Sequence, residues 1–259
     1  MTRKTRKTRE SREFTLGSST GALPFGWSEH APYIQSLFRP WRPDDGYSEA
    51  ELVAAEASLG FRLPARLRGY YASWGHRRDM NQMHNELFYP EQLIVRADGL
   101  VFCAENQGVW LWGIPLANLD EPDPPVHEAL NNWSASQGPG VDHWEPRYPR
   151  LSDFLNELTL IHAFGHGAVH GGWSHLKSLD PETADQLERQ WRRVMVTPLF
   201  YGLVPDADFE APDVYLRKGM ALSQSGVYRS QETYSVAAGS AEDLAAVADE
   251  FGLTWEEQW

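Results

Sequence analysis

The sequence predicts an α+β fold: a single domain with a mostly antiparallel sheet of about six strands flanked by helices. Three observations support this prediction. Patterns typical of helix starts and stops occur near both ends of the chain, short apolar runs occupy its middle, and Gly- or Asn-containing breaks of hairpin length separate those runs. Because no internal repeat or linker divides the body, residues 23–259 are expected to form one domain behind a disordered basic leader at residues 1–22.

Two helices are expected at the start of this domain. Ser48-Glu49-Ala50-Glu51 has the pattern of a capping box, and Gly60 can end that helix in the left-handed conformation. Pro64 suits the first turn of a second helix, which Gly75 would end. The apolar residues of the second helix recur at helical spacing, namely Leu67, Tyr70, Tyr71 and Trp74.

The strands are expected from residue 86 onward. The clearest hairpin pattern is Leu100 to Pro115, where two apolar runs flank the polar tip Glu105-Asn106-Gln107-Gly108, and we expect this hairpin at the centre of the sheet. The Gly- and Pro-rich segment 134–149 is expected to be an exposed loop. The remaining expected elements, in order, are a helix capped by Ser152, a helix from Pro181 to Val196, two strands within residues 213–239 and a helix from Ser240 to Gly252.

The composition is that of a globular chain with an acidic body. Of the 259 residues, 42% are hydrophobic and 23% are charged, and the formal net charge is −13. Met1 to Glu13 holds six Lys/Arg and two Asp/Glu, which leaves 17 basic and 34 acidic residues, a charge of −17, in the rest of the chain. Such a body repels nucleic-acid phosphates and attracts basic proteins. The leader is interpreted as a solubilising segment, with contact to nucleic acid as the alternative.

Cysteine usage and hydropathy indicate a cytoplasmic protein that does not enter a membrane. The single cysteine, Cys103, permits no internal disulfide, so nothing indicates an oxidising compartment. No run approaches the roughly 18 apolar residues of a membrane-spanning helix, and the first 20 residues lack the apolar core of a signal peptide.

His162, His166 and His170 are the strongest hint of a metal site, because on one continuous helix they would line a single face. Glycines at positions 165, 167, 171 and 172 disfavour such a helix, and no nearby carboxylate has the place of a ligand. We therefore expect no metal and no other cofactor, and we expect partly buried histidines near a helix end.

The residues show no recognisable catalytic arrangement. Cys103 lies between Phe102 and Ala104 in an expected strand, where no neighbouring base would lower the pKa of its thiol. The sequence contains no H-E-x-x-H, G-x-S-x-G or phosphate-binding glycine motif. We therefore predict that the protein is not an enzyme.

Trp110 and Trp112 share one face of the second hairpin strand, and Val109 and Leu111 share the other. A strand with two apolar faces is either covered on both sides or keeps one face for a partner. Large aromatic side chains are more often buried in a core, but both interpretations stay open here.

Several segments resemble the SUKH superfamily, in the branch related to the fungal cell-wall regulators Smi and Knr. The segment SEAELVAAEASLGFRLPARLRGYYASWG is similar to the opening helices of that family, and ADGLVFCAENQGVWLWGI is similar to its central strands. LSDFLNELTLIHAFG resembles the helix that follows, and DVYLRKGMALSQSG with TYSVAAGSAEDLAAV resembles the closing strands and helix. The likeness runs in order from about Tyr47 to Trp255.

The resemblance implies a non-enzymatic protein-binding module. Bacterial members of this superfamily are mostly immunity proteins, which bind and neutralise a cognate toxin of a polymorphic toxin system by occlusion. The expected partner is such a toxin, with a basic nuclease-type domain as one candidate, because an acidic surface can cover a basic groove. The residues expected at the interface are Glu105, Asn106, Gln107, Trp110 and Trp112, with Trp133, Asp142, Trp144 and Glu145 as outlying contacts.

Two other functions stay open at this point. One is a regulatory or scaffold protein of the same fold without a toxin partner, as in the fungal branch. The other is a metal-dependent hydrolase that uses the three histidines. The flanking genes would distinguish the regulatory or scaffold protein from an immunity protein. Bound metal together with turnover in a substrate screen would establish the hydrolase. The sequence does not indicate the oligomeric state.

Overall fold

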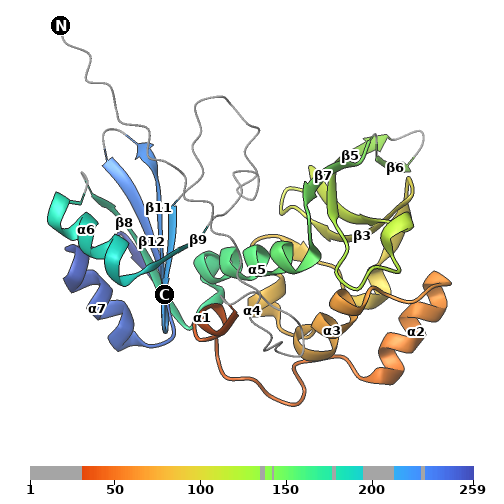
Figure 1. Ribbon diagram of the computed structural model, residues 1–259, viewed down its shortest axis with the longest axis horizontal. Helices are drawn as coiled ribbons and strands as arrows, with labels where there is room; N and C mark the ends of the chain where they lie inside the picture. The colour runs from red at the N-terminus through yellow and green to blue at the C-terminus, as the bar shows by residue number, and fades with distance from the viewer. Residues whose placement is uncertain (1–30, 135–137, 142, 177–178, 195–212, 229–230) are drawn as a thin grey trace, which may run out of the picture.

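The strands form two antiparallel sheets, and a long helix lies between them (Figure 1). The computed structural model describes residues 31–134, 138–141, 143–176, 179–194, 213–228 and 231–259. The basic leader expected at residues 1–22 therefore lies outside the described residues. The α+β class and the antiparallel pairing are confirmed, but the strands divide between two sheets instead of forming a single sheet of about six.

Local capping residues begin the helices α2, α6 and α7. The helices are α1 Ala31–Gln35, α2 Glu49–Leu59, α3 Ala65–Trp74, α4 Arg78–Asn81, α5 Leu151–His162, α6 Pro181–Gln190 and α7 Ala241–Phe251, with the short turns η1 Pro90–Gln92, η2 Leu116–Asn118 and η3 Ala163–Gly167. The capping box at Ser48 is complete, and Gly60 (φ 81°) follows α2 as expected. Asp180 caps α6 and Ser240 caps α7. Within the described part of the chain, no helix combines the length and the apolar composition needed to cross a membrane.

The start of α5 differs from the sequence-based expectation. Ser152 does not cap this helix, which already begins at Leu151. Instead, the Ser152 N–H and hydroxyl both donate to the carboxylate of Asp123, at 2.9 and 2.7 Å. A side chain that is distant in sequence therefore satisfies an amide of the first turn, which is why the local pattern did not identify the cap.

The first sheet contains the predicted hairpin near its centre. Its order is β1-β3-β4-β5-β6, with β2 also paired to β3 and β7 also paired to β5. The strands are β1 Glu86–Leu87, β2 Ile94–Arg96, β3 Gly99–Ala104, β4 Trp110–Pro115, β5 Val126–Ser134, β6 Gly138–Val141 and β7 Glu145–Tyr148. Leu100 lies opposite Ile114 and Ala104 lies opposite Leu111, and the register shifts by one residue between Val101 and Cys103. The segment 134–149, expected to be a loop, contains β6 and β7, because both pair with the long strand β5.

The second sheet is built from the end of the chain. Its order is β13-β8-β12-β11-β10-β9. The strands are β8 His170–Leu176, β9 Arg192–Val194, β10 Asp213–Arg217, β11 Met220–Tyr228, β12 Gln231–Ala238 and β13 Glu257–Gln258. Helix α6 ends at Gln190 instead of Val196, because Trp191 is extended (φ −112°, ψ 147°) and the next residues pair with β10 as β9.

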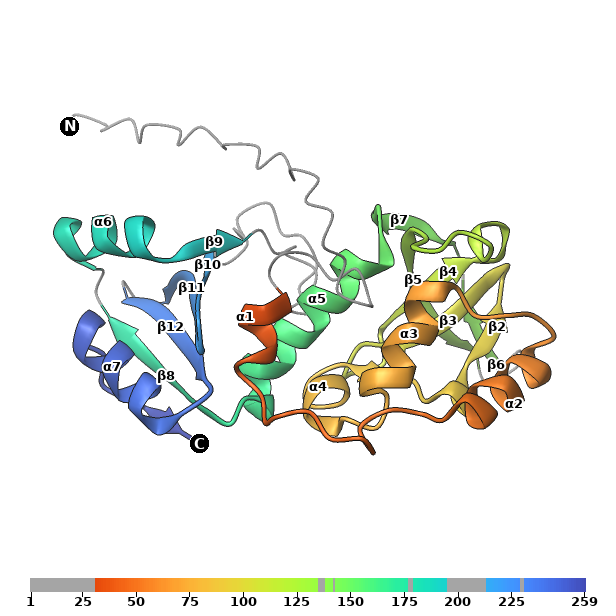
Figure 2. The same ribbon diagram turned by 60° about the horizontal axis from the view of Figure 1, so that its bottom comes forward.

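Helix α5 connects the two sheets through one core (Figure 2). Every residue of α5 except Asp153 is buried, as expected of a helix that is covered on all sides. The core around α5 includes Phe102 and Trp112 of the first sheet together with Val214 and Leu216 of the second. The other face of the second sheet packs against α6 and α7 in a smaller, separate core. The first sheet is therefore left with one face turned away from α5.

Candidate functional site

The hairpin tip, residues Glu105–Gly108, is a tight turn with a defined backbone. The Glu105 N–H donates to the Trp110 carbonyl at 2.9 Å, and the Gly108 N–H donates to the Glu105 carbonyl at 2.8 Å. Gly108 has φ 71°, and a Cβ atom there would meet no other atom within 4 Å. Glycine is therefore favoured at this position by its backbone conformation and not by crowding.

Side chains from three places fix the hairpin tip. The buried Asn85 accepts the Asn106 N–H through Oδ1 at 3.2 Å, and Asn131 donates from Nδ2 to the Gly108 carbonyl at 2.8 Å. The Glu105 carboxylate accepts the Val109 N–H at 3.2 Å. A turn held by so many hydrogen bonds has little conformational freedom to lose when it binds something.

The residues predicted at this hairpin differ in the exposure of their side chains. The side chains of Asn106 and Gln107 are exposed. Glu105, in contrast, is only 6% exposed and serves the turn, and Trp112 is 2% exposed and packs on Phe154 with ring centroids 5.7 Å apart. Trp110 lies between these extremes and packs against the same core. The core interpretation therefore holds for Trp112, and only Asn106 and Gln107 are free to contact a partner with their whole side chains.

Of the four outlying predicted contacts, the structure describes the side chains of Trp144 and Glu145. Trp144 covers the first sheet where two glycines make room for it: its Nε1 donates to the Arg96 carbonyl at 3.1 Å, and a Cβ on Gly99 or Gly113 would come within 2.6 Å of its ring. Glu145 is exposed in β7, opposite Glu128 of β5. Trp133 belongs to β5 through its backbone, but its side chain lies outside the described residues, as does the whole of Asp142.

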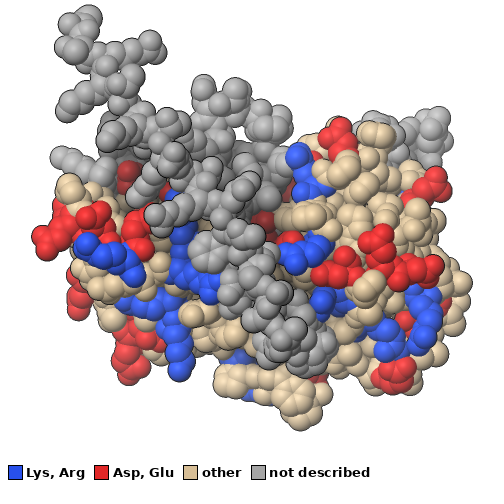
Figure 3. All heavy atoms as spheres, viewed as in Figure 1, with Lys and Arg blue, Asp and Glu red and all other residues tan. Residues whose placement is uncertain are grey.

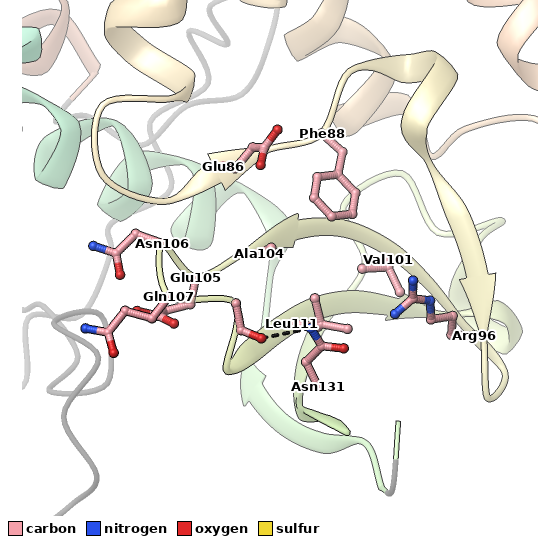
Figure 4. A pocket seen from close by; sticks show the side chains of 11 residues that line it. Glu86, Phe88, Arg96, Val101, Ala104, Glu105, Asn106, Gln107, Leu111 and Asn131 are labelled. Atoms are coloured by element: carbon pink, nitrogen blue, oxygen red, sulfur yellow. Dashed lines mark hydrogen bonds between the residues drawn. The ribbon is translucent and has the colours of Figure 1, made fainter. Parts of the chain in front are cut away.

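A pocket of about 380 Å³ opens beside the hairpin tip, on the face of the first sheet that is turned away from α5 (Figure 4). Asn106 and Gln107 lie at one end of it, and Arg96 lies at the other. The remaining lining residues are Glu86, Phe88, Val101, Ala104, Glu105, Gly108, Leu111 and Asn131. Sequence reasoning missed Arg96, Asn85 and Asn131, because they reach the hairpin only through strand pairing.

Exposed apolar side chains lie at the same end of the sheet. Val109, directly after the tip, is 45% exposed, and Leu130 of β5 is 42% exposed. The two are neighbours through the backbone, because the Asn131 N–H donates to the Val109 carbonyl at 2.8 Å and Leu130 lies opposite Trp110. Leu130 shares the face of its cross-strand partner Trp110, whereas Val109, one residue before Trp110, belongs to the opposite face. We call the side chains of Asn106, Gln107 and Val109 the tip surface.

The three histidines do not share a helix face. His162 ends α5, His166 has a left-handed backbone (φ 73°) in η3 and stacks on Trp259, and His170 begins β8. The Nδ1 atom of His162 accepts the N–H groups of Met83 and His84, both at 3.0 Å. Burial lowers the pKa of His162 to about 3. Among the described residues, no group of three or more His, Cys, Asp or Glu side chains could hold a metal ion.

Cys103 is fully buried in the core around α5. Burial raises the pKa of its thiol well above the ordinary value. A thiol in this environment stays protonated at neutral pH, and no solvent reaches it. Its position fits the predicted role of a small apolar core residue.

Comparison with known proteins yields no relative for this chain: no protein-family model, curated protein or solved structure matches it.

Proposed function

We propose that this protein is a non-enzymatic binding module of the cytoplasm, which neutralises a cognate toxin protein by covering it with the tip surface. The observation that carries this proposal is the hairpin tip, whose backbone is fixed by Asn85, Asn131 and Glu105 while its two central side chains are exposed. The likeness of the E-N-Q-G-V-W segment to the SUKH superfamily supports a partner of the toxin class.

The energetics of the tip surface favour protein binding. Fixing a flexible side chain or loop on association costs roughly 0.5–1.5 kcal/mol for each ordered side chain. The hydrogen bonds around the tip remove the backbone part of this cost before binding. Val109 adds apolar area that a partner can bury, next to amides that can form specific hydrogen bonds.

Net charge favours a basic partner. The chain carries −13 overall, which attracts cationic proteins over several ångströms and raises their rate of association. Figure 3 shows that acidic and basic side chains are interspersed on the face in view, over both sheets. The face in view therefore shows no single acidic patch, and the proposed attraction rests on the net charge, which a basic nuclease-type toxin fits.

The test is binding of the product of a toxin-like gene adjacent to this one. We expect a purified complex and protection of cells from the toxin, both abolished or weakened at least tenfold by the double variant Asn106→Ala/Gln107→Ala. The control is Gln190→Ala, which removes an exposed amide from α6, next to the second sheet. Absence of binding and of protection by the wild-type chain would refute the proposed function, and equal binding by the double variant would refute the tip surface as its site.

A further inference from the structure

The pocket beside the tip has an apolar middle and polar ends. Val101 and Leu111 are buried but do not belong to the core around α5, because they point to the opposite face of the first sheet. Figure 4 shows them between Arg96 at one end and the tip residues at the other, with the Phe88 ring above. A volume of about 380 Å³ is at the lower end of the range for small-molecule sites, roughly 300–1,000 Å³.

Arg96 is the unusual residue of this pocket. Its side chain is half-buried, and no carboxylate of the described residues pairs with it. Burial lowers the pKa of its guanidinium, and no neighbouring acid offsets that effect. Other partly buried arginines of this chain do have acidic partners: Arg68 pairs with Glu56 at 3.0 Å and Arg217 with Glu250 at 2.7 Å. A half-buried cation without a counter-ion is expected to gain from an anionic ligand.

The other residues of the pocket narrow the class of anion. Glu86 and Glu105 lie toward the tip, so a ligand with two or more negative charges would be repelled there. The walls between the ends are apolar and can cover an aliphatic or aromatic body. A single carboxylate at one end of an apolar body matches this arrangement, because a guanidinium binds a carboxylate through two parallel hydrogen bonds.

We propose that this pocket binds an apolar monocarboxylate, with the carboxylate on the Arg96 guanidinium and the apolar body against Phe88, Val101 and Leu111. The C-terminal residue of a polypeptide and a free organic acid both present these groups. The inference depends on the proposed function in one respect, because both assign binding to the hairpin tip. Asn106 and Gln107 belong to the tip surface and also line the pocket.

The experiment is a titration of the full chain with three small probes, in which the NMR chemical shifts of the backbone amides report binding. The probes are 3-phenylpropionate, its neutral counterpart 3-phenylpropanamide, and N-acetylphenylalanine as a mimic of a polypeptide C-terminus. We expect both carboxylates to shift the amides of residues 86–88, 96–111 and 131, and the neutral amide to bind at least about tenfold more weakly. Tighter binding of N-acetylphenylalanine would identify a chain terminus as the source, and tighter binding of 3-phenylpropionate a free acid.

Variants separate recognition by Arg96 from general attraction. Arg96→Gln should weaken carboxylate binding at least about tenfold, Arg96→Lys should weaken it less, and Glu86→Gln should strengthen it about twofold or more. The control Arg62→Gln removes an exposed arginine that does not line the pocket and should change nothing. Equal binding of acid and amide, equal binding by Arg96→Gln, or no shift at millimolar probe would overturn the inference. None of these outcomes bears on toxin binding, so the two proposals can fail separately.

Discussion

Asn85 and Asn131 hold opposite sides of the hairpin tip, and the chemistry of their partners orients both amides. The Asn106 N–H can only donate, so the oxygen of Asn85 must face it; the Gly108 carbonyl can only accept, so the nitrogen of Asn131 must face it. The remaining amide atoms, Nδ2 of Asn85 and Oδ1 of Asn131, are buried and have no partner in the described part of the chain. Both residues therefore stabilise the turn while leaving part of their own hydrogen-bonding capacity unused.

His162 shows how one buried residue makes stability depend on pH. In the folded state the pKa of His162 is about 3, whereas an unfolded histidine titrates near 6.5. The unfolded chain therefore binds a proton between these pH values that the folded chain does not. The contribution of His162 to stability is complete above pH 6.5 and is lost progressively as the pH falls toward 3.

We predict that His162→Gln removes this pH dependence. Between pH 6 and pH 4 the free energy of unfolding of the wild type should fall more steeply than that of the variant, by up to about 1.4 kcal/mol per pH unit. Urea unfolding at four pH values from 7 to 4 would measure the difference in slope. Parallel curves for the two proteins would contradict the prediction, because they would show that His162 has the same pKa in the folded and unfolded states.

At the scale of single elements, α5 depends on a side chain outside its own sequence. Asp123 accepts two hydrogen bonds from Ser152, and it also lies 3.7 Å from the guanidinium of Arg66. A carboxylate at a helix N-terminus is stabilised both by the free amide and by the helix dipole. Asp123 thus connects α5 to α3 and to the segment before β5.

We predict that Asp123→Ala lowers the free energy of unfolding by about 1–2 kcal/mol, because the first turn of α5 loses its acceptor. Ser152→Ala is the matched variant: it removes only the hydroxyl donor and leaves the backbone N–H bound to Asp123, so it should cost less, about 0.5–1 kcal/mol. Urea unfolding of both variants measures the difference. An equal or larger loss for Ser152→Ala would mean that the hydroxyl, and not the amide, is the important donor.

At the scale of the whole molecule, α5 makes the two sheets depend on each other. Phe154 of α5 packs on Phe102, Trp112 and Tyr148, with ring centroids 5.1 to 5.7 Å apart. The same core continues to Leu216, Ala221 and Ala237 of the second sheet. Neither sheet can cover its inner face without this helix, which is a physical reason to expect cooperative unfolding.

We predict that Phe154→Ala lowers the free energy of unfolding by about 3–5 kcal/mol, because it leaves a cavity in the shared core. Hydrogen exchange should show equal loss of protection in β3 and β12. The comparison variant is Phe251→Ala, which lies in the smaller core beside Trp191. Loss of protection confined to β3 in the first variant and to β12 in the second would show that the sheets unfold independently.

Part of the candidate site could be predicted from the sequence. The polar tip between two apolar runs identified Asn106 and Gln107 as exposed, because the period of a strand and the glycine of a turn are local properties. Glu105 and Trp112 could not be separated from them, since burial depends on what covers the strand. The contributions of Arg96 and Asn131 depend on the register of neighbouring strands, which the sequence pattern does not specify.

By itself, the sequence determined the elements whose signals lie within a few residues: the capping box at Ser48, the left-handed glycines after two helices, and the hairpin around Gly108. Only the tertiary structure decided that the strands form two sheets, that α5 is buried between them, and that Arg96 shares a pocket with the hairpin tip. Caps and turns depend on hydrogen bonds between near neighbours in the chain, whereas sheet membership and burial depend on apolar surface contributed by segments far apart.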